Sequence, residues 1–487
     1  MNKDRTGHVS MWPDYFPHKK RERLLAYLYP LPDKLGYEVR CENDWIFFIH
    51  SWQELKQCMF DNKLEVHTYK LLKSFLYFDD AVKDNHACVH LANSSKQVVM
   101  ITARGPKNIQ CKLVSSTCWG WRKEPDEIYI KALRNIYDTF DYGVHPSPGS
   151  LGTNALKSML APKKGEKAHR YSRPSSMLRN RLFTYGSGGR ADDFSLYEEY
   201  EIAYEQDFDN HYANTAMQGV PTDGTRKFGL TGIPTDDLTI MGEFRVCFTE
   251  AWITIPNNED SIRKFSPFYT RDKNGLSWQT RPGRYHGYYW SPVIKACIDA
   301  GYKVEIGSGW GWTHLDKFLV PFIERAIELR QHFKEQDMPL EAQMTKGLIV
   351  ATLGRFGMKP YNLELISKED KQPGDEILLD MEYVPKRDGS PVTGYYIRRK
   401  EEPNASNLTQ VLYYIIAQAN LALYYRCIAE EENGNTVIMT NYDSLMCLEP
   451  PTLDMTGLKL KTHHKLRPMG RRSYESKEAR IRPGVKA

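Results

Sequence analysis

The sequence predicts a multidomain α/β protein. Runs typical of strands alternate with runs typical of amphipathic helices through roughly the first 150 residues, for example QVVMITARG followed by EIYIKALRNIYDTFDYG. Such alternation is typical of layered α/β domains. With 487 residues, the chain is long enough for two to four domains. A segment rich in Pro, Gly, Ser and Lys interrupts the pattern at 145–176, and we expect a domain junction in it.

After this junction, an irregular β-rich insertion is expected at about 218–310, where turn signals are frequent. Three helices should follow, because apolar residues recur at helical spacing. Their sequences are HLDKFLVPFIERAIELRQHFKEQ, LEAQMTKGLIVATLGRFGMKP and SNLTQVLYYIIAQANLALYYRCIAEE. Gly357 and Pro360 should end the second helix. The sequence between the second and third helices reads as a hairpin-rich excursion.

The composition argues against several classes of protein. Hydrophobic residues make up 41% of the chain, the mean hydropathy is −0.57, and no apolar run approaches about 18 residues, so neither a transmembrane helix nor a membrane partner is expected. The N-terminal residues lack the apolar stretch of a signal peptide. Nine scattered cysteines without a Cys-x-x-Cys pair predict neither a zinc site nor a disulfide framework. We therefore expect an intracellular protein that is not secreted.

Positive charge is unevenly distributed, although the formal net charge is only +5. Ten Lys or Arg residues and two Glu residues lie between Lys459 and Ala487, and a second basic stretch covers Ala161–Arg181. Such segments suit a polyanionic partner such as nucleic acid. The alternative is a solvated surface with a loose basic tail.

Two aspartates are the candidate catalytic residues. Asp207 lies in the strand-like stretch YEQDFDNHYANTAM, and Asp443 lies at an expected bend between two strands in NTVIMTNYDSLMC. A strand and a hairpin tip can bring together two acids that are 236 positions apart. Two such carboxylates can hold a pair of divalent cations about 3.5–4 Å apart for phosphoryl transfer. Taken singly, each acid also reads as a cap or a surface group.

A set of short motifs resembles the protein-primed branch of family B DNA polymerases, found in phages, adenoviruses and linear plasmids. DFDNHYANTAM resembles the first palm motif DxxSLYPxxM and retains Asp207 and Tyr212. TNYDS resembles the second palm motif DTDS and retains Asp443, whereas Asn441 replaces its first Asp. Both expected metal ligands are therefore present.

Further motifs follow in the family's order between about Tyr129 and Lys465. KGLIVATLGRFG resembles the fingers motif KxxxNSxYGKF, with Val350 and Leu353 in place of Asn and Tyr. FIERAIELRQHFKEQ resembles the fingers helix that supplies cations to the triphosphate. KTHH resembles the KxY motif, with His463 in place of Tyr, and YGSGG resembles YxGG with one residue inserted. The residues that these motifs retain are Arg330, Lys334, Lys346, Lys461, Tyr185, Gly188 and Gly189.

The resemblance implies a right-hand polymerase fold with palm, fingers and a short thumb, after an N-terminal exonuclease-like α/β domain of the ribonuclease H type. The domains expected on this basis are an exonuclease-like domain at 1–160, a linker and palm with an insertion at 161–317, fingers and a second insertion at 318–405, palm at 406–458, and a minimal thumb or basic tail at 459–487.

The implied function is template-directed DNA polymerisation on a primer and template. Asp207 and Asp443 would bind two Mg²⁺ ions, for which Mn²⁺ can substitute. The residues implied for dNTP binding are Tyr212, Arg330, Lys334 and Lys346, and those implied for primer or DNA contact are Lys461, Tyr185, Gly188 and Gly189. A terminal protein would provide the first primer, because the insertion after Met217 and the excursion at about 360–404 lie where the family has its two terminal-protein regions.

The exonuclease-like domain lacks the family's metal ligands. Its residues include no Asp-x-Glu triplet, NSSKQ (Asn93–Gln97) stands where NxxFD is expected, and YIKAL places Leu133 where YxxxD has its Asp. We therefore expect no 3′–5′ exonuclease activity. The changes at Asn441, Val350 and Leu353 leave open a catalytically degenerate, nucleic-acid-binding scaffold with the polymerase fold. A third alternative is an enzyme that copies or makes RNA.

Overall fold

The structure of the chain is a computed structural model that describes residues 23–31, 36–69, 71–76, 87–91, 98–104, 110–161, 171, 174–195, 198–222, 224–229, 233–258, 264–272, 275–358, 361–366, 371–377, 396–401, 408–469, 473–478 and 480–481. The described residues divide into two compact units. Unit 1 contains those of His169–Val320 and Leu408–Ala487, and unit 2 contains those of Asp14–Ala168 and Pro321–Asn407. The finer five-part division predicted from the sequence stays a prediction.

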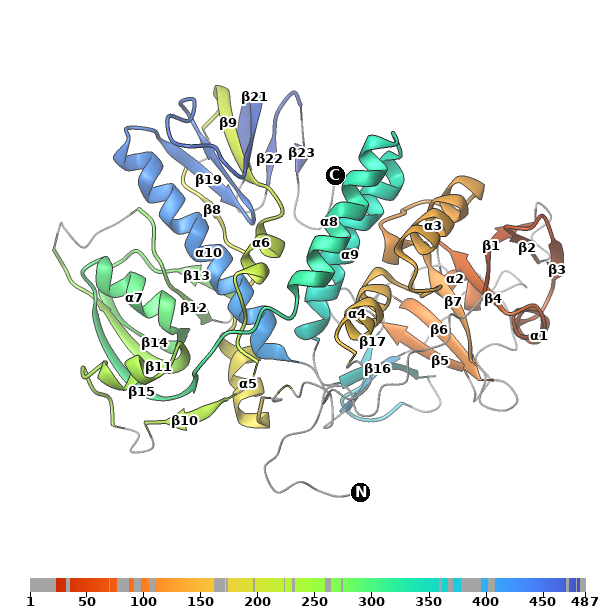
Figure 1. The fold of residues 1–487 in the computed structure, drawn as a ribbon, viewed down its shortest axis with the longest axis horizontal. Coiled ribbons are helices and arrows are strands. Elements are labelled where there is room, and N and C mark those ends of the chain that lie inside the picture. Colours follow the sequence, from red (N-terminus) through yellow and green to blue (C-terminus); the bar gives the residue numbers. More distant parts are fainter. Residues whose placement is uncertain are drawn as a thin grey trace. The chain divides into compact units, whose positions relative to one another are not determined.

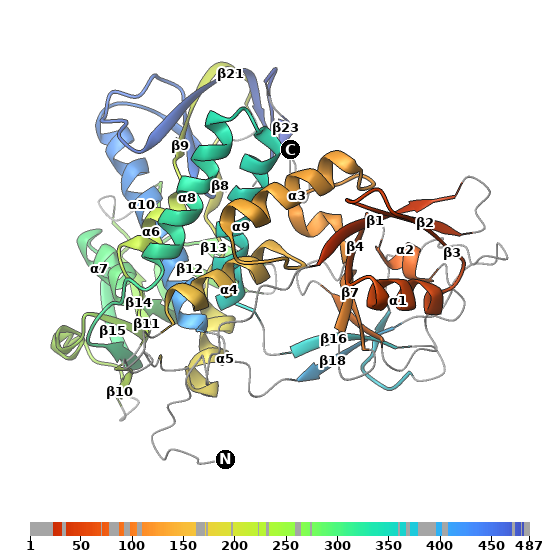
Figure 2. The same ribbon diagram turned by 45° about the vertical axis from the view of Figure 1, so that its right-hand side comes forward.

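Unit 2 contains a seven-stranded mixed sheet with the strand order β3-β2-β1-β4-β7-β6-β5. The strands β1 to β4 and β7 are labelled in Figure 2. β1, β4 and β7 run parallel, and the other neighbours pair antiparallel. The strands are β1 (Leu24–Pro30), β2 (Tyr37–Cys41), β3 (Ile46–Ile49), β4 (Leu64–Thr68), β5 (Ala87–Leu91), β6 (Val98–Arg104) and β7 (Gln110–Ser115). The helices that follow the strands are α1 (Trp52–Asp61), α2 (Leu71–Leu76) and α3 (Glu127–Phe140). The expected layered α/β arrangement is confirmed.

The helix α1 builds the core on one face of this sheet. The Ser51 side chain accepts a hydrogen bond from the Glu54 N–H group at 3.1 Å, which satisfies one donor of the first turn. Trp52 and Leu55 are fully buried in the same apolar cluster as the strands. The Trp52 ring meets Phe75 of α2 edge-on, with 5.0 Å between centroids. The apolar side of the helix thus forms the core, as its sequence pattern predicts.

The helix α3 carries the stretch that resembles the third exonuclease motif. Asp126 caps it by accepting from the Tyr129 N–H group at 2.9 Å. The Tyr129 hydroxyl lies 2.9 Å from Nδ1 of His67 on β4, and both residues are fully buried. Leu133, which stands where the family has Asp, is also fully buried. The second exonuclease stretch, Asn93–Gln97, lies outside the described residues.

Unit 2 also contains a helix that the sequence analysis missed. The remaining elements of the unit are α4 (Pro148–Met159), α8 (Val320–Glu335), α9 (Pro339–Phe356) and a three-stranded sheet of β16 (Tyr361–Ile366), β18 (Tyr396–Glu401) and β17 (Glu376–Ile377). The first of these, α4, occupies 12 residues of the segment read as a junction. Ser147 caps it, and Pro148 fits its first turn. A Cβ atom at Gly152 would lie 1.8 Å from Thr352 Oγ1 of α9, so this glycine permits close helix packing rather than breaking a helix.

Unit 1 contains an antiparallel seven-stranded sheet with the order β23-β22-β21-β9-β20-β19-β8. Its strands are β8 (Ala191–Asp193), β9 (Tyr200–Phe208), β19 (Val437–Asn441), β20 (Ser444–Cys447), β21 (Leu458–Pro468), β22 (Tyr474–Glu475) and β23 (Arg480–Ile481). The helices beside it are α5 (Ser176–Tyr185), α6 (His211–Met217) and α10 (Thr409–Glu432).

The long helix α10 runs along one face of this sheet (Figure 1). Arg426 of α10 donates to the Gln206 side chain of β9 at 2.9 Å, and His211 Nε2 lies 3.0 Å from the Ala419 carbonyl oxygen. Side chains alternate along a strand, so Glu205 and Asp207 project to the face opposite Gln206. None of the helices described in the structure is both long and apolar enough to cross a membrane.

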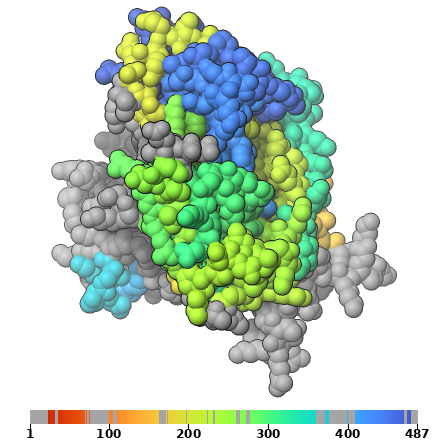
Figure 3. Space-filling model, turned by 90° about the vertical axis from the view of Figure 1, so that its left-hand side faces the viewer, coloured from red at the N-terminus to blue at the C-terminus, as the bar shows by residue number. Residues whose placement is uncertain are grey.

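The predicted β-rich insertion is confirmed within unit 1, where it forms the surface drawn in green in Figure 3. It contains a four-stranded antiparallel sheet in the order β10-β15-β11-β14 and a separate hairpin. Its elements are β10 (Arg226–Phe228), β11 (Val246–Ile255), the hairpin strands β12 (Tyr269–Asp272) and β13 (Gly275–Trp278), β14 (Gly283–Trp290), α7 (Ser291–Asp299) and β15 (Lys303–Trp312). The helix α7 was not predicted from the sequence and follows β14 without a loop.

Candidate active site

Asp207 and Asp443 lie at the same end of the unit 1 sheet. β9 and β20 pair antiparallel with Asp207 opposite Ser444. The Phe208 N–H group donates to the Asp443 carbonyl oxygen at 2.8 Å, so the backbones of the two acidic segments touch. Asp443 follows Tyr442 in the turn between β19 and β20, and Tyr442 has a left-handed backbone with φ of 59°. Such a backbone is uncommon for a tyrosine and recurs at functional sites.

Lys461 of β21 lies directly beside Asp207. Its Nζ atom is 2.6 Å from Asp207 Oδ2 and 3.4 Å from Glu205 Oε2. Burial alone would lower the pKa of Lys461, but the hydrogen bond to Asp207 and the charge of Glu205 together raise it above its ordinary value. The family resemblance implies primer contact for Lys461. The structure adds that its ammonium group neutralises one of the two candidate metal ligands.

Glu205 and His463 form a buried pair behind this contact, and the sequence analysis missed Glu205. His463 Nε2 lies 2.9 Å from Glu205 Oε2, and His463 Nδ1 lies 3.1 Å from Ser476 Oγ. Burial would raise the pKa of Glu205, but the His463 hydrogen bond and the Lys461 charge hold it below its ordinary value. The available signal was the alternation Glu-x-Asp on β9, which places both acids on one face.

The side-chain oxygen atoms at this end of the sheet are suitable ligands for a hard divalent cation. Asp207 is a quarter exposed, and Asp443 is half-buried. Asn441 Oδ1 is buried and has no hydrogen-bond partner among the described residues, so it is an acceptor that a metal-bound water or a cation would satisfy. Carboxylate and amide oxygens are ligands that Mg²⁺ accepts. Across the described parts of the chain, no group of three or more His, Cys, Asp or Glu side chains is arranged to hold a metal ion, so the proposed site depends on these two carboxylates.

The glycine motif and the first palm motif meet at this site. A Cβ atom at Gly189 would lie 2.5 Å from Tyr212 Oη and 2.5 Å from Tyr442 Cδ1. Only a glycine therefore fits between the two rings. Gly188 has open space on its Cβ side. Tyr185, at the end of α5, is half-buried, and its carbonyl oxygen accepts from the Tyr269 hydroxyl at 2.5 Å.

The residues predicted to bind the triphosphate belong to unit 2, whereas the two aspartates belong to unit 1. Arg330 and Lys334 lie one turn apart on α8, and Lys346 lies on α9. Lys334 and Lys346 are exposed, and Arg330 is half-buried. Their role in nucleotide binding stays a prediction.

The two departures in the fingers motif have different surroundings on α9. Val350 is 54% exposed, whereas Leu353, which stands where the family has Tyr, is only 3% exposed. Leu353 therefore serves as a core residue of unit 2 and offers no surface to a nucleotide.

Comparisons with known proteins agree with the motifs and the fold. The sequence model of DNA polymerase type B, organellar and viral, matches residues 127–438. No curated protein sequence matches the chain. The structure is similar to phi29 DNA polymerase complexed with primer–template DNA and incoming nucleotide substrates, with a TM-score of 0.67, 12% identity, and coverage of 96% of this chain and 93% of that chain. The binary complex of phi29 DNA polymerase with primer–template DNA gives a TM-score of 0.66 and 12% identity, with coverage of 95% of this chain and 91% of that chain.

An orthorhombic crystal form of the phi29 enzyme gives a TM-score of 0.65 at 13% identity, with coverage of 93% of this chain and 87% of that chain. These likenesses show the fold, a mixed α/β multidomain arrangement of the phi29 type, and they confirm the predicted fold class. The matching sequence model covers well over half of the residues. The chain therefore belongs to the organellar and viral family of type B DNA polymerases.

Proposed function

We propose that this protein is a template-directed DNA polymerase that extends a primer with dNTPs. The observation that supports this most is the pairing of β9 with β20, which places Asp207 against the Asp443 turn in a chain of the type B polymerase family. The reaction joins the primer 3′ oxygen to the α-phosphorus of a dNTP and releases pyrophosphate.

Asp207 and Asp443 would hold two Mg²⁺ ions, or Mn²⁺ in their place. When bound, such ions lower the pKa of the primer hydroxyl and stabilise the departing pyrophosphate. Lys461 would exchange its contact with Asp207 for a phosphate near the primer end. Arg330, Lys334 and Lys346 would neutralise the triphosphate, as the resemblance to the fingers motifs implies.

Primer extension separates this function from its alternatives. Pure protein is incubated with a primer–template, Mg²⁺ or Mn²⁺, and either dNTPs or rNTPs, on DNA and RNA templates. Extension with dNTPs on DNA supports the proposal. Tight DNA binding without extension supports the degenerate scaffold. The buried Leu353 and the neutral Asn441 favour this alternative. Preferential use of rNTPs or of an RNA template supports the third interpretation.

Tyr212 is proposed to pack under the deoxyribose and to exclude a 2′-hydroxyl. The substitution Tyr212→Val should lower the preference for dNTP over rNTP by about a hundredfold. The reason is that the shape of the pocket is what discriminates against the added 2′-hydroxyl of an rNTP. The measurement is kcat/KM for a matched dNTP and rNTP pair. Tyr425→Val, which removes an exposed tyrosine from α10, should leave the ratio unchanged. An unaltered ratio in Tyr212→Val would rule out the assignment.

The exonuclease-like domain is proposed to lack 3′–5′ exonuclease activity. Leu133 is buried in α3, and Glu65 on β4 is 1% exposed and paired with His67 at 3.4 Å. Burial would raise the pKa of Glu65, but the adjacent His67 ring holds it below its ordinary value. A carboxylate held in this way is not available to bind cations at an open site.

We therefore expect a labelled primer, paired or mismatched at its 3′ end, to keep its length during incubation with Mg²⁺ in the absence of dNTPs. Gel analysis over several hours measures this. Metal-dependent shortening that persists in Asp443→Asn and disappears in Glu65→Gln would contradict the expectation, because it would place a working exonuclease on β4.

A terminal protein is proposed as the first primer on the basis of the family resemblance. By that resemblance, the first terminal-protein region would correspond to the sheet of β10, β11, β14 and β15, and the second to the sheet of β16, β17 and β18. Transfer of labelled dNMP to a hydroxyl of a co-expressed protein would demonstrate it.

A further inference from the structure

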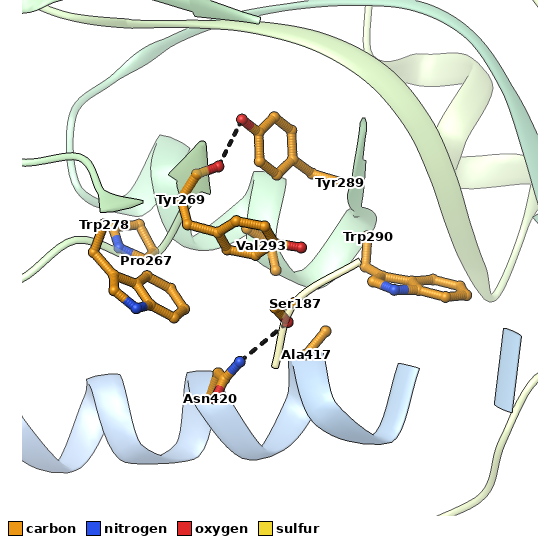
Figure 4. A pocket seen from close by; sticks show the side chains of 9 residues that line it. All are labelled: Ser187, Pro267, Tyr269, Trp278, Tyr289, Trp290, Val293, Ala417 and Asn420. Carbon is orange, nitrogen blue, oxygen red and sulfur yellow. Dashed lines mark hydrogen bonds between the residues drawn. The ribbon is translucent and has the colours of Figure 1, made fainter. Parts of the chain in front are cut away.

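The short segment that joins α5 to β8, residues 186–190, is held by one side chain of α10. The Asn420 amide nitrogen lies 3.2 Å from Ser187 Oγ and donates to the Gly188 carbonyl oxygen at 3.0 Å. The Asn420 carbonyl oxygen accepts from the Arg190 N–H group at 2.8 Å. Asn420 is 3% exposed, and its contact with Ser187 is drawn in Figure 4. A single buried amide therefore binds both ends of Ser187–Arg190.

The same segment touches the candidate active site on its other side. The Arg190 carbonyl oxygen accepts from the Tyr442 N–H group at 2.6 Å, directly before Asp443. Gly189 lies between the Tyr212 and Tyr442 rings, where a Cβ atom would clash with both side chains. A displacement of the segment must therefore move the sugar-facing tyrosine, the turn that carries the catalytic acid, or both.

The space beside this segment is small. The cavity beside Asn420, lined by Tyr269, Trp278 and Trp290 among others, has a volume of only about 10 Å³ (Figure 4). It has room for one water molecule at most. The start of the segment has its own anchor, since Arg271 donates to the Gly186 carbonyl oxygen at 2.8 Å. Loss of the Asn420 contacts should therefore loosen residues 187–190 without detaching α5.

We propose that Asn420 is a positioning residue of the polymerase site, which sets the spacing between Tyr212 and the Asp443 turn through residues 187–190. This inference rests on the proposed polymerase function. It assigns to α10, on the side of the site away from the substrate, a part in sugar selection. A buried amide that donates twice and accepts once cannot be replaced by an apolar or an acidic side chain of the same shape.

The experiment compares two variants of Asn420 with a matched control in the full-length protein. Asn420→Ala removes all three contacts, and Asn420→Asp keeps the shape and the acceptor for Arg190 but removes both donors. Gln418→Ala removes an amide from the same helix, where its nitrogen donates to the Tyr414 hydroxyl at 2.8 Å. Two quantities are measured well below each variant's melting temperature. They are the dNTP-to-rNTP ratio of kcat/KM and the hydrogen exchange of peptides that cover 186–193 and 437–444.

Both Asn420 variants should lower the ratio by about tenfold and speed exchange in both peptides, because small displacements at an active site have large kinetic effects. Gln418→Ala should change neither quantity. An unchanged ratio and unchanged exchange in the 437–444 peptide, whatever the melting temperatures, would overturn the proposal. If the wild type incorporates no nucleotide, the polymerase assignment fails. The exchange measurement then decides the positioning role: faster exchange in 437–444 upholds it, and unchanged exchange overturns it.

Discussion

Asp443→Asn is expected to lower the rate of nucleotide incorporation by on the order of 10³-fold while leaving the fold intact, which corresponds to about 4 kcal/mol of transition-state stabilisation. The substitution keeps the size of the side chain and the backbone contact from the Phe208 N–H group to the residue 443 carbonyl oxygen. It removes one of the two carboxylate charges that would bind the cations. Single-turnover primer extension in Mg²⁺ measures the rate, and the melting temperature reports on the fold.

Asp209→Asn is the matched control for this substitution. Asp209 lies two residues after Asp207, is 40% exposed in its side chain, and forms an ion pair with Lys459. Exposed ion pairs contribute about 0–1 kcal/mol, so its loss should change the incorporation rate by no more than a few-fold. Equal rates in Asp443→Asn and the wild type, or an equal loss in both variants, would remove Asp443 from the catalytic centre.

The local structure around both aspartates could be predicted because each lies in a strongly patterned stretch. The apolar, β-prone residues on either side of Asn441, Tyr442 and Asp443 predict two strands and a tight turn, and β19 and β20 are those strands. The helices α8, α9 and α10 were predicted for the same reason, since apolar side chains recur at helical spacing. What spacing cannot predict is the pairing of β9 with β20, because tertiary packing decides which distant strands become neighbours.

The features that were missed depend on partners distant in sequence. The glycines of α4 read as breakers, and only the close approach of Thr352 shows that Gly152 is a packing position. Glu205 gains its importance from Lys461 and His463, which arrive on β21. In the sequence, Asn420 is one polar residue in a long helix. Its importance follows from its contacts with Ser187 and Gly188, which only the structure shows. Composition and periodicity carry no information about such contacts.

Arg190 is the second residue for which we expect a large effect, on stability rather than on chemistry. It is fully buried, and its guanidinium group donates to Asp192 at 2.9 Å and to the Ser266 carbonyl oxygen at 2.7 Å. The group also lies 4.4 Å from the centre of the Trp278 ring. Arg190→Met would leave the Asp192 carboxylate buried without its counterion. We expect the free energy of unfolding of unit 1 to fall by about 3–5 kcal/mol.

Denaturant titration followed by tryptophan fluorescence measures this loss, and Trp278 gives a probe next to the substituted side chain. Arg284→Met is the matched control: its ion pair with Glu305 has a similar length of 2.7 Å, but the two side chains are 54% and 40% exposed, so the expected loss is below about 1 kcal/mol. The double variant Arg190→Met/Asp192→Leu should recover part of the stability, because it removes the uncompensated charge together with its partner. If Arg190→Met and Arg284→Met cost the same, burial does not govern the strength of the Arg190 pair.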